Sequence, residues 1–153
     1  MGLDMYLLAK KHVANFKHSP AKAKKAYAAM VKASGLKMDD LPEGSVELSV
    51  DVGYWRKANH IHAWFVKNCQ DDKDDCKEYC VSEALLGDLR AACLDVLDEK
   101  DYSLLPTRGG FFFGSTDYGD AYVNDLKDTV KQLDAVLDNP KFKGWNFYYQ
   151  SSW

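Results

Sequence analysis

The sequence predicts an α+β fold, built as a single domain over residues 1–153, in which a small, mostly antiparallel sheet packs against several helices. Apolar and polar residues alternate over 45–52, which is the pattern of a strand with one buried face. Other segments, such as the one from about 118 to 137, carry apolar residues at the three-to-four spacing of an amphipathic helix. A chain of 153 residues also has the usual size of one domain.

Strands are expected near 4–12, 45–53 and 145–150, with 109–114 as a candidate further strand and 78–81 as a short one. The first of them opens with β-compatible residues. In the second, the residues expected to share one buried face are Val46, Leu48, Val50 and Val52. The chain ends in aromatic residues, which predicts that its last strand docks into the domain rather than fraying.

Helices are expected over 20–34, from Gly53 to about 68, over 82–97 and from about 118 to 137. Ser19 is expected to cap the first helix, with Pro20 at its first position and Gly35 just past its end. Ser82 is expected to cap the third.

The segment 53–65 is unusual because it holds two Trp, two cations, an Asn and two His where an ordinary helix would carry Leu and Glu. At helical spacing Trp55, Asn59 and His62 fall on the inward stripe. The polar residues expected to point elsewhere are Arg56, His60 and Lys67. A buried amide or imidazole costs roughly 1–3 kcal/mol unless it is hydrogen-bonded, so Asn59 and His62 require internal partners or a ligand.

Composition excludes several classes of function. With 20 basic and 23 acidic residues the formal charge is −3, which disfavours binding to a nucleic-acid backbone. No apolar run is long enough to span a membrane and no signal peptide is recognisable, so a cytoplasmic protein is expected. The four cysteines lack a CxxC pair and the aspartate-rich segment 70–75 lacks the EF-hand pattern. We therefore predict no metal site and no cofactor.

Residues 109–116 form a second unusual segment, with three glycines around the consecutive rings of Phe111–Phe113. Three consecutive Phe residues cannot share one face of a strand, so either both faces are covered or one ring is presented outward. Gly109, Gly110 and Gly114 allow the backbone to come close to another group. That group is either a phosphate held by backbone N–H groups or simply the other arm of a turn.

Several motifs together resemble a family of small bacteriophage, prophage and bacterial proteins. They are MGLDMY at 1–6, VGYWRKAN at 52–59 with HAWF at 62–65, FFGS at 112–115, and the terminal FYYQSSW at 147–153. The resemblance implies a phage or prophage setting, in which small proteins antagonise host defence by sequestering a signalling molecule or by blocking a host protein. It implies no particular reaction.

The first functional hypothesis is a binding pocket for a small anionic ligand such as a nucleotide. Arg56 and Lys57 would neutralise phosphate. The side chains expected to stack on a base are Tyr54, Trp55 and Trp153. Those expected to read its polar edges are Asn59, His62, Gln150 and Ser151, and Ser115 of the glycine-rich segment completes the predicted site.

Two alternatives remain open at this stage. One is an enzyme acting on a phosphorylated small molecule, with His62 or His60 as acid or base oriented by Asp4 or Asp51. No catalytic residue is assigned, because no nucleophile motif accompanies these histidines. The other is an inhibitor that binds a host protein through the Phe111–Phe113 segment or the terminal aromatics. A concave pocket lined by Trp55, His62 and Trp153 would favour the ligand, and a flat aromatic patch the protein partner. Oligomeric state is not indicated by the sequence.

Overall fold

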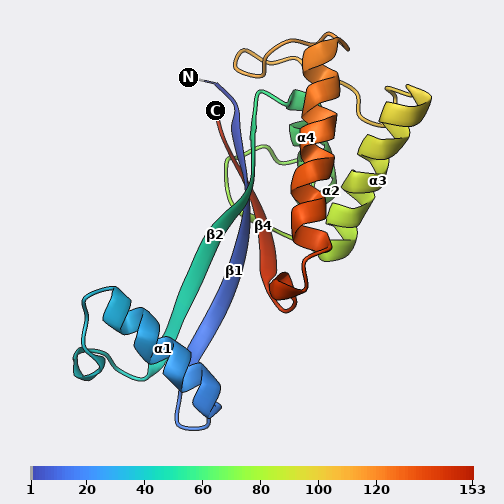
Figure 1. Ribbon diagram of the computed structural model, residues 1–153. Helices are drawn as coiled ribbons and strands as arrows, with labels where there is room; N and C mark the ends of the chain where they lie inside the picture. The colour runs from blue at the N-terminus through green and yellow to red at the C-terminus, as the bar shows by residue number, and fades with distance from the viewer. Residues whose placement is uncertain (1) are drawn as a thin grey trace. The chain divides into compact units, whose positions relative to one another are not determined.

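The computed structural model describes residues 2–153 and has an α+β fold with a four-stranded antiparallel sheet, which confirms the predicted class. The strand order is β2-β1-β4-β3 (Figure 1). The strands are β1 (Asp4–Asn15), β2 (Gly44–Arg56), β3 (Tyr79–Val81) and β4 (Asn146–Ser152). The helices are α1 (Ala21–Ala33), α2 (Asn59–Cys69), α3 (Glu83–Glu99) and α4 (Asp120–Leu137), with short 3-10 turns at Met38–Asp40 and Pro140–Phe142.

The chain forms two compact units. The first unit comprises the chain up to Ala9 together with Asp51–Trp153, and the second unit comprises Lys10–Val50. The first unit therefore holds α2, α3, α4, β3 and β4, and the second holds α1. Strands β1 and β2 each contribute residues to both units.

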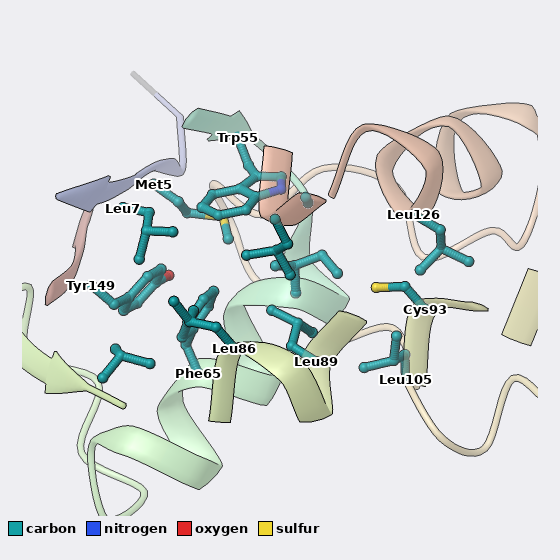
Figure 2. Packing of buried hydrophobic residues seen from close by; sticks show 14 of the residues in the cluster. Met5, Leu7, Trp55, Phe65, Leu86, Leu89, Cys93, Leu105, Leu126 and Tyr149 are labelled. Carbon is teal, nitrogen blue, oxygen red and sulfur yellow. The ribbon is translucent and has the colours of Figure 1, made fainter. Parts of the chain in front are cut away.

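The core of the first unit forms where the inward residues of the sheet meet α2, α3 and α4. Alternate residues of β1 are buried, among them Met5 and Leu7, as the period of two in a strand requires. The rings of Phe65 on α2 and Tyr149 on β4 stack with centroids 3.9 Å apart (Figure 2). The antiparallel pair β3–β4 is in register with Tyr79 opposite Tyr149. The second unit has a smaller core of Val13, Tyr27 and Val31.

The largest correction to the predicted elements concerns Gly53–Ala58. This segment continues strand β2 to Arg56, and α2 begins only at Asn59. Gly53 is packed inside the strand, where an added Cβ would lie 3.1 Å from Leu7 Cβ and from the Trp55 ring. The chain leaves the strand at Lys57, which has a φ of 60° and donates its N–H to the Leu3 carbonyl at 2.8 Å. This long-range bond, rather than the glycine, sets the boundary.

Three other expectations were wrong. Residues 109–114 form a turn and not a strand, because the backbone folds back so that Phe113 N–H bonds the Gly110 carbonyl. Leu48 and Val50 are 38% and 39% exposed, so the expected buried face of β2 does not form there. Ser19 does not cap α1, since its Oγ instead accepts the Phe16 N–H.

The other helix signals are confirmed. Ser82 Oγ accepts the Leu85 N–H and caps α3. Gly35 follows the end of α1 with a φ of 82°, a left-handed conformation that favours glycine. The C-terminal strand is docked as expected, with Phe147 and Tyr149 buried. Among residues 2–153, no helix has the length and apolar character needed to cross a membrane.

Candidate functional site

The motifs at 52–59, 112–115 and 147–153 lie near the end of the sheet where β1 starts and where β2 and β4 end (Figure 1). Leu3 joins two of them, because its N–H donates to the Phe112 carbonyl at 3.0 Å and its carbonyl accepts the Lys57 N–H at 2.8 Å. Phe113 then meets the terminal Trp153 edge to face, with ring centroids 6.2 Å apart. Segments far apart in the sequence thus build one region of the first unit.

Asn59 fastens this region together. Its Nδ2 donates to the carbonyls of Phe113 at 3.0 Å and Ser115 at 2.8 Å, and its Oδ1 accepts the Arg108 N–H at 2.8 Å. The expectation that a buried Asn59 needs internal partners is confirmed. Because these bonds occupy both amide hydrogens and the carbonyl oxygen, the side chain serves to hold the loop 108–115 against the start of α2.

A cavity of about 370 Å³ opens beside this loop. Its walls come from the end of β2, the start of α2, the loop before α4 and the first turns of α4. The side chains that give the cavity its charge and polarity are Arg56, Lys57, Asn59, His60, Thr107, Ser115, Asp117, Asp120 and Asp125. Gly114 lies against Lys57 with a φ of 88°, where an added Cβ would come within 3.0 Å of Lys57 Cβ.

His60 lines the cavity, which differs from the expectation that it points away from the buried side. It is only 2% exposed, and its ring lies 4.2 Å from that of Tyr122. Burial lowers the pKa of His60 to about 4, so the imidazole is neutral near pH 7. Within the described part of the chain its Nε2 has no hydrogen-bond partner. A buried, unpartnered ring nitrogen beside a cavity is suited to a ligand contact.

The cavity carries charges of both signs. Arg56 and Lys57 stand at the end of β2, whereas Asp117, Asp120 and Asp125 line the side of the loop and α4. Burial, with a smaller contribution from Asp128, raises the pKa of Asp125 to about 6. Asp117 is already engaged, because its Oδ2 accepts the Ser115 hydroxyl at 2.9 Å. A ligand that offers only negative charge would therefore meet repulsion on one side.

His62 belongs to a separate chain of hydrogen bonds that runs from the buried Tyr149 hydroxyl through Asp74 to the exposed Trp153. Its Nδ1 lies 2.7 Å from the Tyr149 hydroxyl, and its Nε2 lies 2.9 Å from Asp74 Oδ2. Burial raises the pKa of Tyr149 well above its usual value, so this hydroxyl keeps its proton and donates it to Nδ1. Burial also lowers the pKa of His62, opposed by Asp74, and the neutral ring then donates Nε2–H to that carboxylate. Trp153 Nε1–H donates to Asp74 Oδ1 at 3.0 Å.

Four of the ten predicted ligand residues line the cavity, namely Arg56, Lys57, Asn59 and Ser115. Trp55 lies in the core, where its indole N–H bonds Thr129 Oγ1 at 2.8 Å, so it is not placed to stack on a base. Ser151 is buried in β4, and Gln150 Nε2 donates to the Cys76 carbonyl. Tyr54 donates its hydroxyl to Asp4.

The pocket of Trp55, His62 and Trp153 that would have favoured the ligand hypothesis does not form. His62 is fully buried and Trp55 nearly so, whereas the Trp153 side chain is 45% exposed at the chain end. Trp55 and His62 are instead held by buried partners, Thr129 and Tyr149. In the observed strand, Trp55 and Arg56 point to opposite faces, which separates the aromatic ring from the cation.

Sequence reasoning missed Thr107, Tyr122, Asp120 and Asp125, and it named His60 only as an alternative acid or base. The run from Ser115 to Asp120, rich in Ser, Thr, Asp and Gly before an amphipathic helix, was the available signal for a polar loop beside a helix start. No comparable signal marks Asp125, whose burial depends on the packing of α4.

Comparisons of the chain with protein-family models, with curated proteins and with solved structures found no match.

Proposed function

We propose that this protein binds a small nucleotide-like ligand in the cavity between the end of β2 and the start of α4. The observation that carries the proposal is the pairing of two cations, Arg56 and Lys57, with a wall of carboxylates in one concave site of about 370 Å³. That volume lies in the usual range for small-molecule sites. A nucleotide matches both sides because it combines an anionic phosphate with sugar hydroxyls and base amino groups.

The phosphate is assigned to Arg56 and Lys57. A guanidinium binds phosphate oxygens in a bidentate fashion, and an ammonium adds a second positive charge. Both side chains are exposed at the site, so contact with them requires no rearrangement of the core. The start of α4 is a poorer place for the anion, because Asp120 already supplies negative charge in that first turn.

Hydrogen-bond donors of the ligand are assigned to the carboxylates of Asp120 and Asp125. Carboxylates accept hydrogen bonds from sugar hydroxyls and base amino groups. Because burial raises the pKa of Asp125 to about 6, this group carries a partial proton population in mildly acidic solution. Binding of the ligand's donors should therefore strengthen as the pH rises from 5 to 7.

Calorimetric titration with AMP, GMP, CMP and UMP tests the proposal. Arg56→Ala should weaken nucleotide binding at least tenfold and change the melting temperature little, because an exposed cation contributes to recognition more than to packing. Lys127→Ala, an exposed cation of α4 outside the cavity lining, is the matched control and should bind like the wild type. Intact binding by Arg56→Ala, or a loss of several degrees in its melting temperature with binding unchanged, would contradict the assignment.

The sequence resemblance to phage and prophage proteins suggests a biological role for this binding, namely antagonism of host defence. Held in such a cavity, a nucleotide used in host-defence signalling would be withdrawn from its receptor. Native mass spectrometry of the protein isolated from a defence-active bacterial culture should then show a retained nucleotide. A preparation that carries none, and that binds none when supplied, would remove this role.

A second candidate is a host-protein inhibitor, which Phe111 favours. Its side chain is 96% exposed at the tip of the turn, an unusual position for a large apolar ring. Phe111→Ser should abolish capture of a host protein if this candidate is right and should leave nucleotide binding unchanged. The enzyme alternative has less support, because both ring nitrogens of His62 are occupied by Tyr149 and Asp74 and burial lowers the pKa of His60 to about 4, far below neutral pH.

A further inference from the structure

A second cavity, of about 290 Å³, shares His60 with the first. One of its sides is a face of α2, where His60, Trp64 and Lys67 follow one another at helical positions i, i+4 and i+7. The opposite side is the segment before the glycine-rich loop, made of Ser103, Leu104, Leu105 and Pro106. Thr107, the next residue along, lines the first cavity, so the two sites are neighbours along the chain as well as along α2.

The second cavity differs from the first in chemistry. Among residues 2–153, no carboxylate lines it. The lining includes instead the half-buried ring of Trp64, together with leucine and proline side chains. Trp64 is held by an edge-to-face contact with Phe65, with ring centroids 5.3 Å apart and an interplanar angle of 87°. Lys67 adds an exposed cation at the rim. An aromatic ring, apolar walls and one cation suit a flat, π-rich group that carries hydrogen-bond acceptors.

His60 connects the two cavities chemically. Its buried Nε2 lacks a partner within the described residues, and leaving such a nitrogen unpaired costs stability. The ring is neutral near pH 7, so this Nε2 can donate or accept one hydrogen bond, depending on the tautomer, with a polar group of a ligand that reaches it. The sugar of a nucleotide lies between its base and its phosphate and carries such groups.

We infer that the second cavity is the base subsite of the ligand whose phosphate binds Arg56 and Lys57, with Trp64 as the stacking residue and Lys67 as a contact to acceptor atoms of the base. The inference rests on the proposed function and assigns the stacking role to Trp64 in place of Tyr54, Trp55 or Trp153, the candidates from the sequence. Every base can stack on an aromatic side chain, so the subsite should accept both purines and pyrimidines. Purines should bind more tightly, because their larger rings stack more strongly.

The experiment compares three probes, namely AMP, adenosine and inorganic phosphate, by calorimetry at pH 7. Lys67→Ala and Trp64→Leu should each weaken AMP and adenosine binding, by about fivefold or more for the tryptophan, and leave phosphate binding unchanged. Arg56→Ala should weaken AMP and phosphate binding and leave adenosine binding unchanged. Lys127→Ala is again the control, with unchanged binding of all three.

Each failure has its own signature. If AMP binds, and Arg56→Ala weakens it while Lys67→Ala and Trp64→Leu do not, the base subsite is wrong and the phosphate site stands. If wild-type protein binds none of the three probes, or binds AMP without regard to Arg56, the proposed function itself is overturned. Lys67 is exposed, so its variant gives a result even if Trp64→Leu fails to fold. Thermal melts followed by circular dichroism show for each variant whether it is folded.

Discussion

The two compact units of this protein differ in charge and in the size of their cores. Residues 10–50 contain eight lysines and four acidic residues, a formal charge of +4, so a total of −3 leaves −7 for the rest of the chain. Helix α1 has four lysines and no acidic residue. The first unit has an extended core and both cavities, whereas the second is built around Val13, Tyr27 and Val31. A net charge of −3 thus describes neither unit.

The contrast between the two units predicts where mutations should affect stability. Side chains in the first unit are tied to each other by buried hydrogen bonds, such as those of Asn59 and His62. In the second unit, Lys22, Lys25 and Lys32 are exposed on α1. We therefore expect the first unit to tolerate little change near its polar network. The second unit should depend on a few apolar contacts and be indifferent to its surface.

The largest expected effect is that of Tyr27→Ala. Removing a buried aromatic ring from a core costs about 3–5 kcal/mol, and this core has few other members to compensate. Hydrogen exchange should show loss of amide protection in α1 while the amides of α3 and α4 keep theirs. Equal loss in both units would show that they unfold together and would remove the distinction between them.

Asn59→Ala should come next. It leaves the carbonyls of Phe113 and Ser115 and the Arg108 N–H without their partner, for an expected loss of about 2–4 kcal/mol in the free energy of unfolding. Urea denaturation measures this loss. Asn68→Ala, which removes one exposed bond to the Trp64 carbonyl on the same helix, is the control and should cost less than about 1 kcal/mol. Similar losses for both would mean that Asn59 does not fasten the loop.

His60 should make the first unit sensitive to acid. Its pKa is about 4 when folded, against about 6.5 when unfolded, so the unfolded chain takes up a proton that the folded chain resists. The stability of the wild type relative to His60→Gln should therefore be constant above pH 7 and fall by about 3 kcal/mol toward pH 4. Asp125 acts in the opposite direction, because its pKa is raised, but it is present in both proteins and cancels.

Urea melts at pH 4, 5, 6 and 7 test this expectation. Parallel curves for wild type and His60→Gln would show that the imidazole reaches solvent. That result would also weaken the case for His60 as a ligand contact between the two cavities.

The smallest effect is expected from replacing Lys22, Lys25 and Lys32 together by Gln. Exposed charges without close partners contribute little, so the free energy of unfolding should change by less than about 0.5 kcal/mol. Nucleotide affinity should also stay unchanged, because none of the three lines a cavity. A marked change in either quantity would show that the basic surface of α1 has a role in the folded state.

The elements with a clear apolar period were predictable from the sequence. Helix α4 follows the expected spacing, with Tyr122, Leu126 and Leu133 buried. Helix α3 begins directly after Ser82, the residue expected to cap it. The boundary between β2 and α2 was not predictable. Residues 53–58 suit a strand or a helix equally by local preference, and the bond from Lys57 to Leu3, more than 50 positions away, decides between them.

The same boundary explains why the site was predicted only in part. Arg56, Lys57 and Asn59 were identified because charge and amide groups are unusual in such a segment, and that reasoning does not depend on helical phase. The stacking residue was not identified in this way. Trp55 was expected to face inward and is indeed buried in the core, whereas Trp64 of α2, which carried no such expectation, reaches a cavity.

Gly114 gives the cavity a mechanical property. A Cβ at this position would lie 3.0 Å from Lys57 Cβ and 3.2 Å from the Lys57 carbonyl oxygen, so the glycine-rich loop packs directly on the backbone of Lys57. The same loop is hydrogen-bonded to the Asn59 side chain, and its Phe112 carbonyl accepts the N–H of Leu3, just before β1. We therefore expect an anion bound at Lys57 to shift the amide resonances of Leu3 and Phe112, which are joined to Lys57 by backbone hydrogen bonds and do not line the cavity themselves.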